Sequence, residues 1–130
     1  MTNESLVQQP YGVIRVHGPW APGPSRLWGG WNPLAVDIDG NPAGLVWSLQ
    51  TSVFAVKSGR HSVQLLWARK HHIRSRTITV DVQSGETVDL ASPALPLFTI
   101  GFPKIRLATS DEVARAEANR LDWHFFGSRP

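Results

Sequence analysis

The chain contains no cysteine. Disulfide bonds and cysteine-ligated zinc are therefore excluded. The chain also lacks a long apolar run. Its best candidate, Ala94–Pro103, is interrupted by Pro96 and Gly101 and falls short of the roughly 18 residues that a transmembrane helix needs. The opening MTNESLVQQP has neither the basic nor the apolar region of a secretory signal. We therefore expect a soluble, cytoplasmic protein that is at most peripheral to a membrane.

Sequence motifs for the common catalytic sites are missing as well. The chain has no phosphate-binding G-x-x-x-x-G-K-[ST], no G-x-S-x-G and no H-E-x-x-H. Asp37 and Asp39 resemble part of a calcium loop, but Ala35 and Val46 occupy the positions of its first and twelfth ligands. We expect both carboxylates to lie on a solvated strand face, and we expect no enzyme, cofactor, metal or small-molecule substrate.

The histidines do not form a recognisable ligand set. His71 and His72 are adjacent, so on an extended strand their rings point to opposite faces. Zinc would need a third ligand such as His61 or His17, which sequence spacing cannot place. A general-base pair such as His61 with Asp81 has no support from spacing either. Exposed loop histidines are the simpler interpretation.

Ten prolines, eleven glycines and apolar residues of period two predict an all-β domain. Asp39-Gly40 is a strong signal for a tight hairpin. One later strand is expected in 97–100 or 104–108. The recurring turns indicate a sandwich of about seven to eight antiparallel strands. The main strands are expected at Tyr11–His17, near Val36–Ile38, and at Ser52–Val56, His61–Ala68, Arg76–Val82 and Thr87–Leu90.

The C-terminal part has a different pattern. Thr109 and Glu112 have the spacing of a capping box, which predicts one α-helix over about Ser110–Leu121. An aromatic tail follows, and it must dock either on its own sheet or on a neighbour. We therefore divide the chain into a disordered N-terminus (1–10), a β-sandwich (11–108), and a helix with its tail (109–130).

Three segments carry a resemblance to a known family. They read VDIDGNPAG, FAVKSGRHSVQL and ITVDVQSGETVDL, and their order is similar to that of PEGA-like domains and small bacterial Ig-like β-sandwich proteins. The resemblance covers about residues 35–90. It implies an Ig-like or PEGA-like sandwich without a catalytic motif, used as a surface or linker module.

The segment WARKHHIRSR, residues 67–76, concentrates positive charge. It holds four of the thirteen Lys and Arg residues, which exceeds the net charge of +3, so the rest of the chain is slightly acidic. Residues Arg69–Arg76 are expected to connect two antiparallel strands as a long hairpin with a solvated tip. Alternatively, the tip binds an anionic lipid or a nucleic acid, weakly and in a salt-dependent way. The residues of this alternative are Arg69, Lys70, His71, His72, Arg74 and Arg76.

Aromatic residues concentrate in two places outside the strands. The Pro- and Gly-rich loop at 18–33 and the tail at 122–130 either plug the sandwich or expose anchors, because Trp and Arg are favoured at binding hot spots. We expect a non-catalytic interaction module, an accessory or structural subunit of a larger protein assembly. Its partner-binding residues are expected to be Trp20, Arg26, Trp28, Trp31, Trp123, Phe125 and Phe126.

Overall fold

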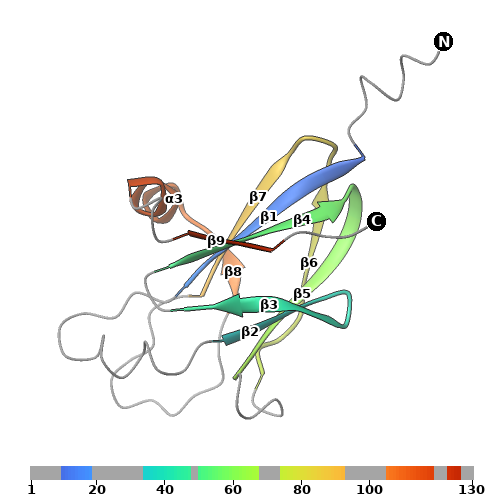
Figure 1. Ribbon diagram of the computed structural model, residues 1–130, viewed down its shortest axis with the longest axis horizontal. Coiled ribbons are helices and arrows are strands. Elements are labelled where there is room, and N and C mark those ends of the chain that lie inside the picture. The colour runs from blue at the N-terminus through green and yellow to red at the C-terminus, as the bar shows by residue number, and fades with distance from the viewer. Residues whose placement is uncertain are drawn as a thin grey trace.

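The computed structural model describes residues 10–18, 34–47, 50–67, 74–92, 105–118 and 123–126. Within these ranges the chain forms nine strands and one helix, α3, at Ser110–Ala118 (Figure 1). The strands are β1 (Tyr11–His17), β2 (Leu34–Ile38), β3 (Asn41–Val46), β4 (Thr51–Lys57), β5 (Gly59–Trp67), β6 (Ile78–Val82), β7 (Thr87–Ala91), β8 (Arg106–Leu107) and β9 (Trp123–Phe126).

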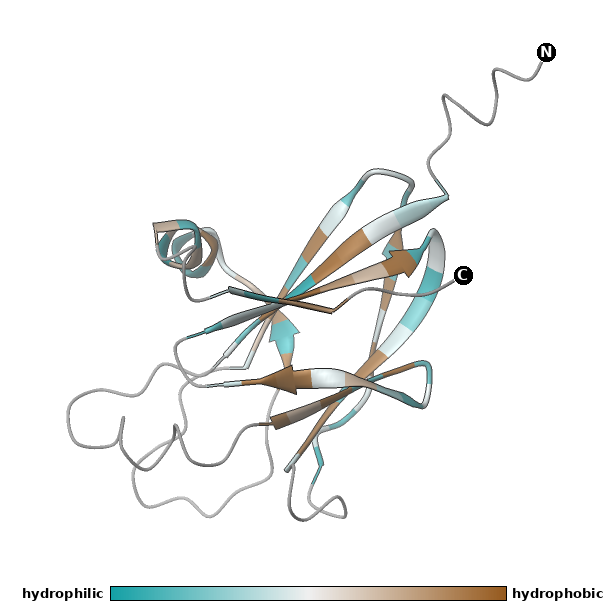
Figure 2. Cartoon of the chain, viewed as in Figure 1, coloured by the Kyte–Doolittle hydropathy of each residue, from teal (hydrophilic) through white to brown (hydrophobic). Residues whose placement is uncertain are grey.

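The strands form two sheets. One has the order β8-β7-β1-β4-β9 and the other the order β3-β2-β5-β6. Alternation along each strand places apolar side chains on the inner faces. In Figure 2 the strands carry brown, apolar stretches, and the turns between them are mostly teal. The predicted all-β sandwich with a C-terminal helix is therefore confirmed, and β1 has the predicted bounds.

The core consists of side chains from both inner faces. Most are β-branched or leucine, which suit a pleated, buried surface. The fully buried members are Ile14 and Val16 of β1, Val36 of β2, Val46 of β3, Val63 and Leu65 of β5, Val82 of β6 and Leu90 of β7. Phe54 of β4 adds an aromatic ring to this core.

A tight turn joins β2 and β3 as the Asp39-Gly40 pair predicts. Both turn residues have positive φ, 55° at Asp39 and 80° at Gly40. Two consecutive residues of this kind match the right-handed twist of a hairpin. Asp39 adopts a conformation that glycine adopts more easily. Its carboxylate forms hydrogen bonds with His61 and with the Ser62 N–H.

Two strand pairs are parallel, which differs from the antiparallel sandwich that we expected. Strand β7 lies parallel to β1, and β9 lies parallel to β4. The chain passes from β6 to β7 through a short turn at 83–86, but these two strands belong to different sheets. Strand β7 therefore pairs with β1 rather than with β6. Strands β5 to β8 and α3 lie between β4 and β9 in the chain, so the connection is far longer than the dozen or so residues that a parallel pairing requires.

The C-terminal tail is part of the sandwich. Strand β9 forms an edge of the five-stranded sheet, so the sandwich extends to Phe126 instead of ending at residue 108. The late strand lies at Arg106–Leu107, inside the second of the two predicted ranges. In the described part of the chain, no helix is long and apolar enough to cross a membrane.

Candidate interaction surface

Helix α3 is attached to the sheet by its first turn. The Thr109 N–H donates to Oε1 of Glu112 (2.8 Å), and the Glu112 N–H donates to Oγ1 of Thr109 (3.2 Å), which confirms the capping box. Arg106 of β8 donates to both oxygens of Glu112, at 2.7 and 2.8 Å. This pairing with Arg106, together with the Thr109 bonds, outweighs burial and lowers the pKa of Glu112 to about 2.

A bidentate ion pair joins β1 to β7 on the outer face of the sheet. Arg15 donates from Nε to Oδ1 of Asp89 (2.6 Å) and from Nη2 to Oδ2 (2.9 Å). Both side chains are largely buried. Burial raises the pKa of Asp89, but hydrogen bonds from His17 and Arg15 and their charge outweigh it and lower the pKa to about 2.

His17 extends this network into β4. Its Nε2 lies 2.8 Å from Oδ1 of Asp89, and its Nδ1 lies 2.9 Å from Oγ1 of Thr51. The three residue types are those of a nucleophile, base and acid relay. However, His17 is only 5% exposed and Thr51 only 3% exposed. With so little access for a substrate, the group is better explained as a structural link between β7, β1 and β4.

Trp123 connects the same network to the C-terminal strand. The guanidinium of Arg15 lies over the Trp123 ring, 5.1 Å from the ring centroid, which is within cation–π range. The indole Nε1 donates to the carbonyl of Ala116 in α3 (2.9 Å). Trp123 therefore fixes β9 both to the sheet and to the helix that precedes it.

Phe126 anchors β9 from the opposite face. Its ring is stacked on Phe54, with centroids 5.2 Å apart and planes 14° apart. On the facing sheet, a Cβ added to Gly44 would lie 2.7 Å from Cδ1 of Phe126. Gly44 therefore makes room for this ring, and Phe126 packs against the core.

Phe125 lies on the same face of β9 as Trp123, with the two ring centroids 6.4 Å apart, and on the face opposite to Phe126. It is 71% exposed, because alternation along β9 turns it to the outer face. It is aligned with Val53 of β4, and the neighbouring pair Val13 and Ala55 lies on the same face. We call this set the outer apolar row: Tyr11, Val13, Val53, Ala55 and Phe125, the first four of them half-buried.

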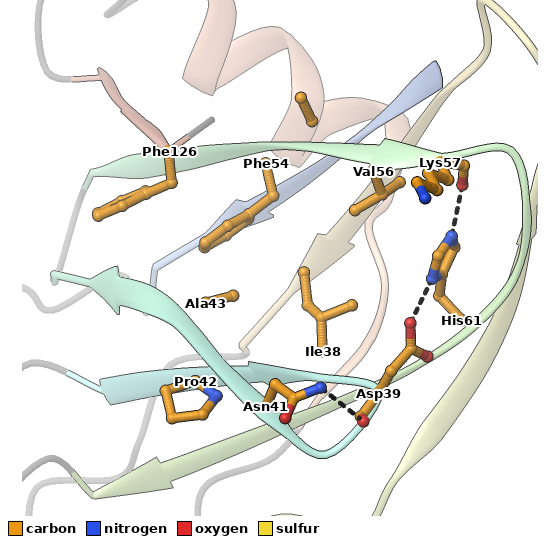
Figure 3. A pocket seen from close by; sticks show the side chains of 11 residues that line it. Ile38, Asp39, Asn41, Pro42, Ala43, Phe54, Val56, Lys57, His61 and Phe126 are labelled. Atoms are coloured by element: carbon orange, nitrogen blue, oxygen red, sulfur yellow. Dashed lines mark hydrogen bonds and ion pairs between the residues drawn. The ribbon is translucent and has the colours of Figure 1, made fainter. Parts of the chain in front are cut away.

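A cleft of about 330 Å³ opens on the side where β3 faces β4 and β9. Its wall is about half polar and half apolar, and Phe54 and Phe126 lie toward one end (Figure 3). At the other end His61 lies between the carboxylate of Asp39 and the backbone carbonyl of Lys57. The polar groups of the cleft are thus concentrated at the two hairpin turns.

This arrangement differs from the histidine pairing considered from sequence. His61 contacts Asp39, whereas Asp81 pairs with Arg60 at 3.5 Å on the exposed surface. Asp39 is exposed as expected, but it lies in the turn instead of on a strand face. Its carboxylate binds both His61 and the Ser62 N–H. Among the described residues, no three His, Asp or Glu side chains are grouped as metal ligands.

The other predicted site residues divide into two groups. Of the described C-terminal aromatics, Trp123 and Phe126 dock on the chain's own sheet, whereas Phe125 contacts the Trp123 ring and remains largely exposed. Arg74 and Arg76 are exposed on either side of buried Ser75. The remaining predicted residues lie outside the described part of the chain: Trp20, Arg26, Trp28, Trp31, Arg69, Lys70, His71 and His72.

Sequence reasoning missed the network of Arg15, His17 and Asp89. The available signal was a pair of charged or polar residues at alternate positions of an otherwise apolar strand, β1. Their partner lies more than 70 residues away, and its strand pairs with β1 in parallel. Local pattern alone therefore could not bring these side chains together.

No family model matches this chain, and no curated protein or solved structure is significantly similar to it.

Proposed function

We propose that this protein is a non-catalytic interaction module, an accessory or structural subunit of a larger protein assembly. Its contact surface in the described part of the chain is the outer apolar row around Phe125. The exposure of Phe125 carries the proposal, because a large aromatic side chain that is 71% exposed gains most when a partner covers it.

The neighbours of Phe125 support this choice. On β4, Val53 lies beside Phe125 and Ala55 lies beside Val13, while Arg15 is the β1 residue opposite Val53. A partner would therefore cover several apolar side chains instead of one isolated ring. The Arg15 network and Trp123 hold β9 rigidly at one side of this row. A surface that is already ordered loses less entropy on binding.

The edge position of β9 is a second supporting feature. Edge strands commonly carry charge or proline that discourages pairing with another chain. Strand β3 contains Pro42, and β6 carries Asp81, but the four residues of β9 are Trp, His, Phe and Phe. Among the described edge strands of at least four residues, β9 is therefore the one that has neither a charged residue nor a proline.

Two matched substitutions test the proposal. Phe125→Asp places a charge in the row, whereas Leu107→Asp changes another exposed residue, 60% exposed, on β8 at the opposite edge of the same sheet. Affinity capture from the native cell extract should yield a protein partner with wild type and L107D, and lose it with F125D. Equal capture by all three would overturn the assignment to this row. Substitution is preferable to truncation because loss of β9 would uncover Phe54 and the edge of β4.

A second candidate is anion binding by the basic segment. Arg74 and Arg76 are exposed, and neither has a carboxylate partner within the described residues. Such cations bind phosphates with an affinity that falls steeply with salt. Retention on heparin at low salt, lost when Arg69, Lys70, Arg74 and Arg76 are all changed to Gln, would favour this alternative. Retention that F125D abolishes would instead place the contact on the outer apolar row.

A further inference from the structure

His61 occupies an unusual position for a histidine at the edge of a cleft. Its Nδ1 lies 2.6 Å from Oδ2 of Asp39, and its Nε2 lies 2.5 Å from the backbone carbonyl oxygen of Lys57. The side chain is only 12% exposed. Figure 3 shows the ring spanning the gap between the two groups.

Both contacts require the ring to donate. A carbonyl oxygen can only accept, and an ionised carboxylate can only accept. A neutral imidazole has one N–H, so it can satisfy one of the two partners and must turn a lone pair toward the other. The geometry therefore specifies the imidazolium form, with a proton on each nitrogen.

We propose that His61 is a pH-sensitive latch. As an imidazolium it ties the turn between β2 and β3, through Asp39, to the end of β4, through Lys57. Loss of one proton breaks one of these ties and loosens that end of the cleft. The latch concerns the cleft, and it is independent of the outer apolar row.

The surroundings favour the charged form. Burial lowers the pKa of His61, but the hydrogen bonds to the Lys57 carbonyl and to Asp39, with the charge of Asp39, outweigh it and raise the pKa. Asp39 also accepts the Ser62 N–H at 2.9 Å, so its carboxylate stays in place. On β5 itself Arg60 is directed to Asp81 of β6, which leaves Asp39 as the carboxylate bonded to the ring.

Asp39 shows why the latch uses this turn. Its φ of 55° lies in a region that disfavours most side chains. Glycine would relieve that strain but would offer no carboxylate. The backbone N–H of Asp39 donates to the Ser62 carbonyl (2.8 Å) while Oδ1 accepts from Ser62. The turn is therefore held to β5 by main chain and side chain together, right beside the latch.

Nitrogen NMR of the His61 ring in the wild-type protein tests the proton count directly. Across about pH 5 to 9, both ring nitrogens should carry protons up to a midpoint above the ordinary value of about 6.5. A single-proton tautomer at pH 6, or a midpoint at or below the ordinary value, would overturn the proposal. This measurement needs no variant.

Amide exchange tests whether the proton controls the turn. After correction for the intrinsic pH dependence of exchange, the Asp39 and Ser62 amides should exchange about tenfold faster above the His61 midpoint, the factor for one hydrogen bond to a charged group. His61→Gln cannot titrate and should remove this step. His124→Gln is the matched control, because Nε2 of His124 contacts only Gln50 among the hydrogen bonds described, and it should keep the step. A step that persists in H61Q would assign the change to another group.

Discussion

Arg15 of β1 and Asp89 of β7 lie side by side in a parallel strand pair and share two hydrogen bonds, at 2.6 and 2.9 Å. The guanidinium of the same Arg15 lies over the Trp123 ring, and Asp89 also contacts His17. One largely buried ion pair thereby links the first strand, the seventh strand and the C-terminal strand. The order of the surface around Phe125 depends on this pair.

Asp89→Asn should destabilise the fold strongly. It keeps the shape of the side chain but leaves the guanidinium of Arg15 largely buried without a counter-charge, which costs about 3 kcal/mol. The free energy of unfolding, from urea titration at pH 7, measures this. Asp81→Asn is the control, because its pair with Arg60 is exposed and such pairs contribute about 0–1 kcal/mol. Similar losses in both variants would contradict the role given to the Arg15 pair.

Acid should weaken the attachment of α3. The pKa of Glu112 is lowered to about 2 by Arg106 and Thr109, so its contribution to stability is complete above the ordinary value of about 4 and is lost as pH falls toward 2. Glu112→Gln should therefore reduce the fall in unfolding free energy between these pH values. Asp111→Asn removes a charge at the adjacent helix position without breaking the Arg106 pair, and it should leave the fall in place. A fall unchanged in E112Q would show that other groups cause it.

The two-sheet architecture could be predicted because it rests on local alternation. Ile14 and Val16 are buried, as the period-two pattern of their strand predicts. Asp39-Gly40 forms the tight turn that its sequence predicts. The parallel strands and β9 could not be predicted in this way. WHFF is too short to show a period, and its place beside β4 depends on the position of α3 and on the space left by Gly44.

The candidate site could likewise be predicted only where it depends on local sequence. The sequence marked the C-terminal aromatics, but it could not say that Phe125 is exposed while Phe126 is packed on Phe54. It gave no sign of the His61–Asp39 contact, because the two residues belong to different hairpins. The exposure of Phe125 and the His61–Asp39 contact both depend on which strands lie side by side, and local sequence does not reveal this.

Gly44→Ala should displace Phe126 and loosen β9. The added Cβ would lie 2.7 Å from the ring, and overpacking of this kind costs about 1–3 kcal/mol. A double-mutant cycle with Phe126→Ala measures the effect. The double variant should be more stable than the sum of the two single losses predicts, because the shortened side chain leaves room for the methyl group. Additive losses would mean that G44A acts through the strand backbone instead.

Substitution by alanine should lower the free energy of unfolding much more at Phe126 than at the adjacent Phe125. Phe126→Ala removes a ring stacked on Phe54 and should cost about 3 kcal/mol, whereas Phe125→Ala removes a ring that is 71% exposed and should cost less than about 0.5 kcal/mol. Urea unfolding measures both variants, and limited proteolysis near β9 should be faster only in F126A. A large loss in F125A would mean that the chain itself already covers this ring, and the outer apolar row would then be a packed surface with no room for a partner.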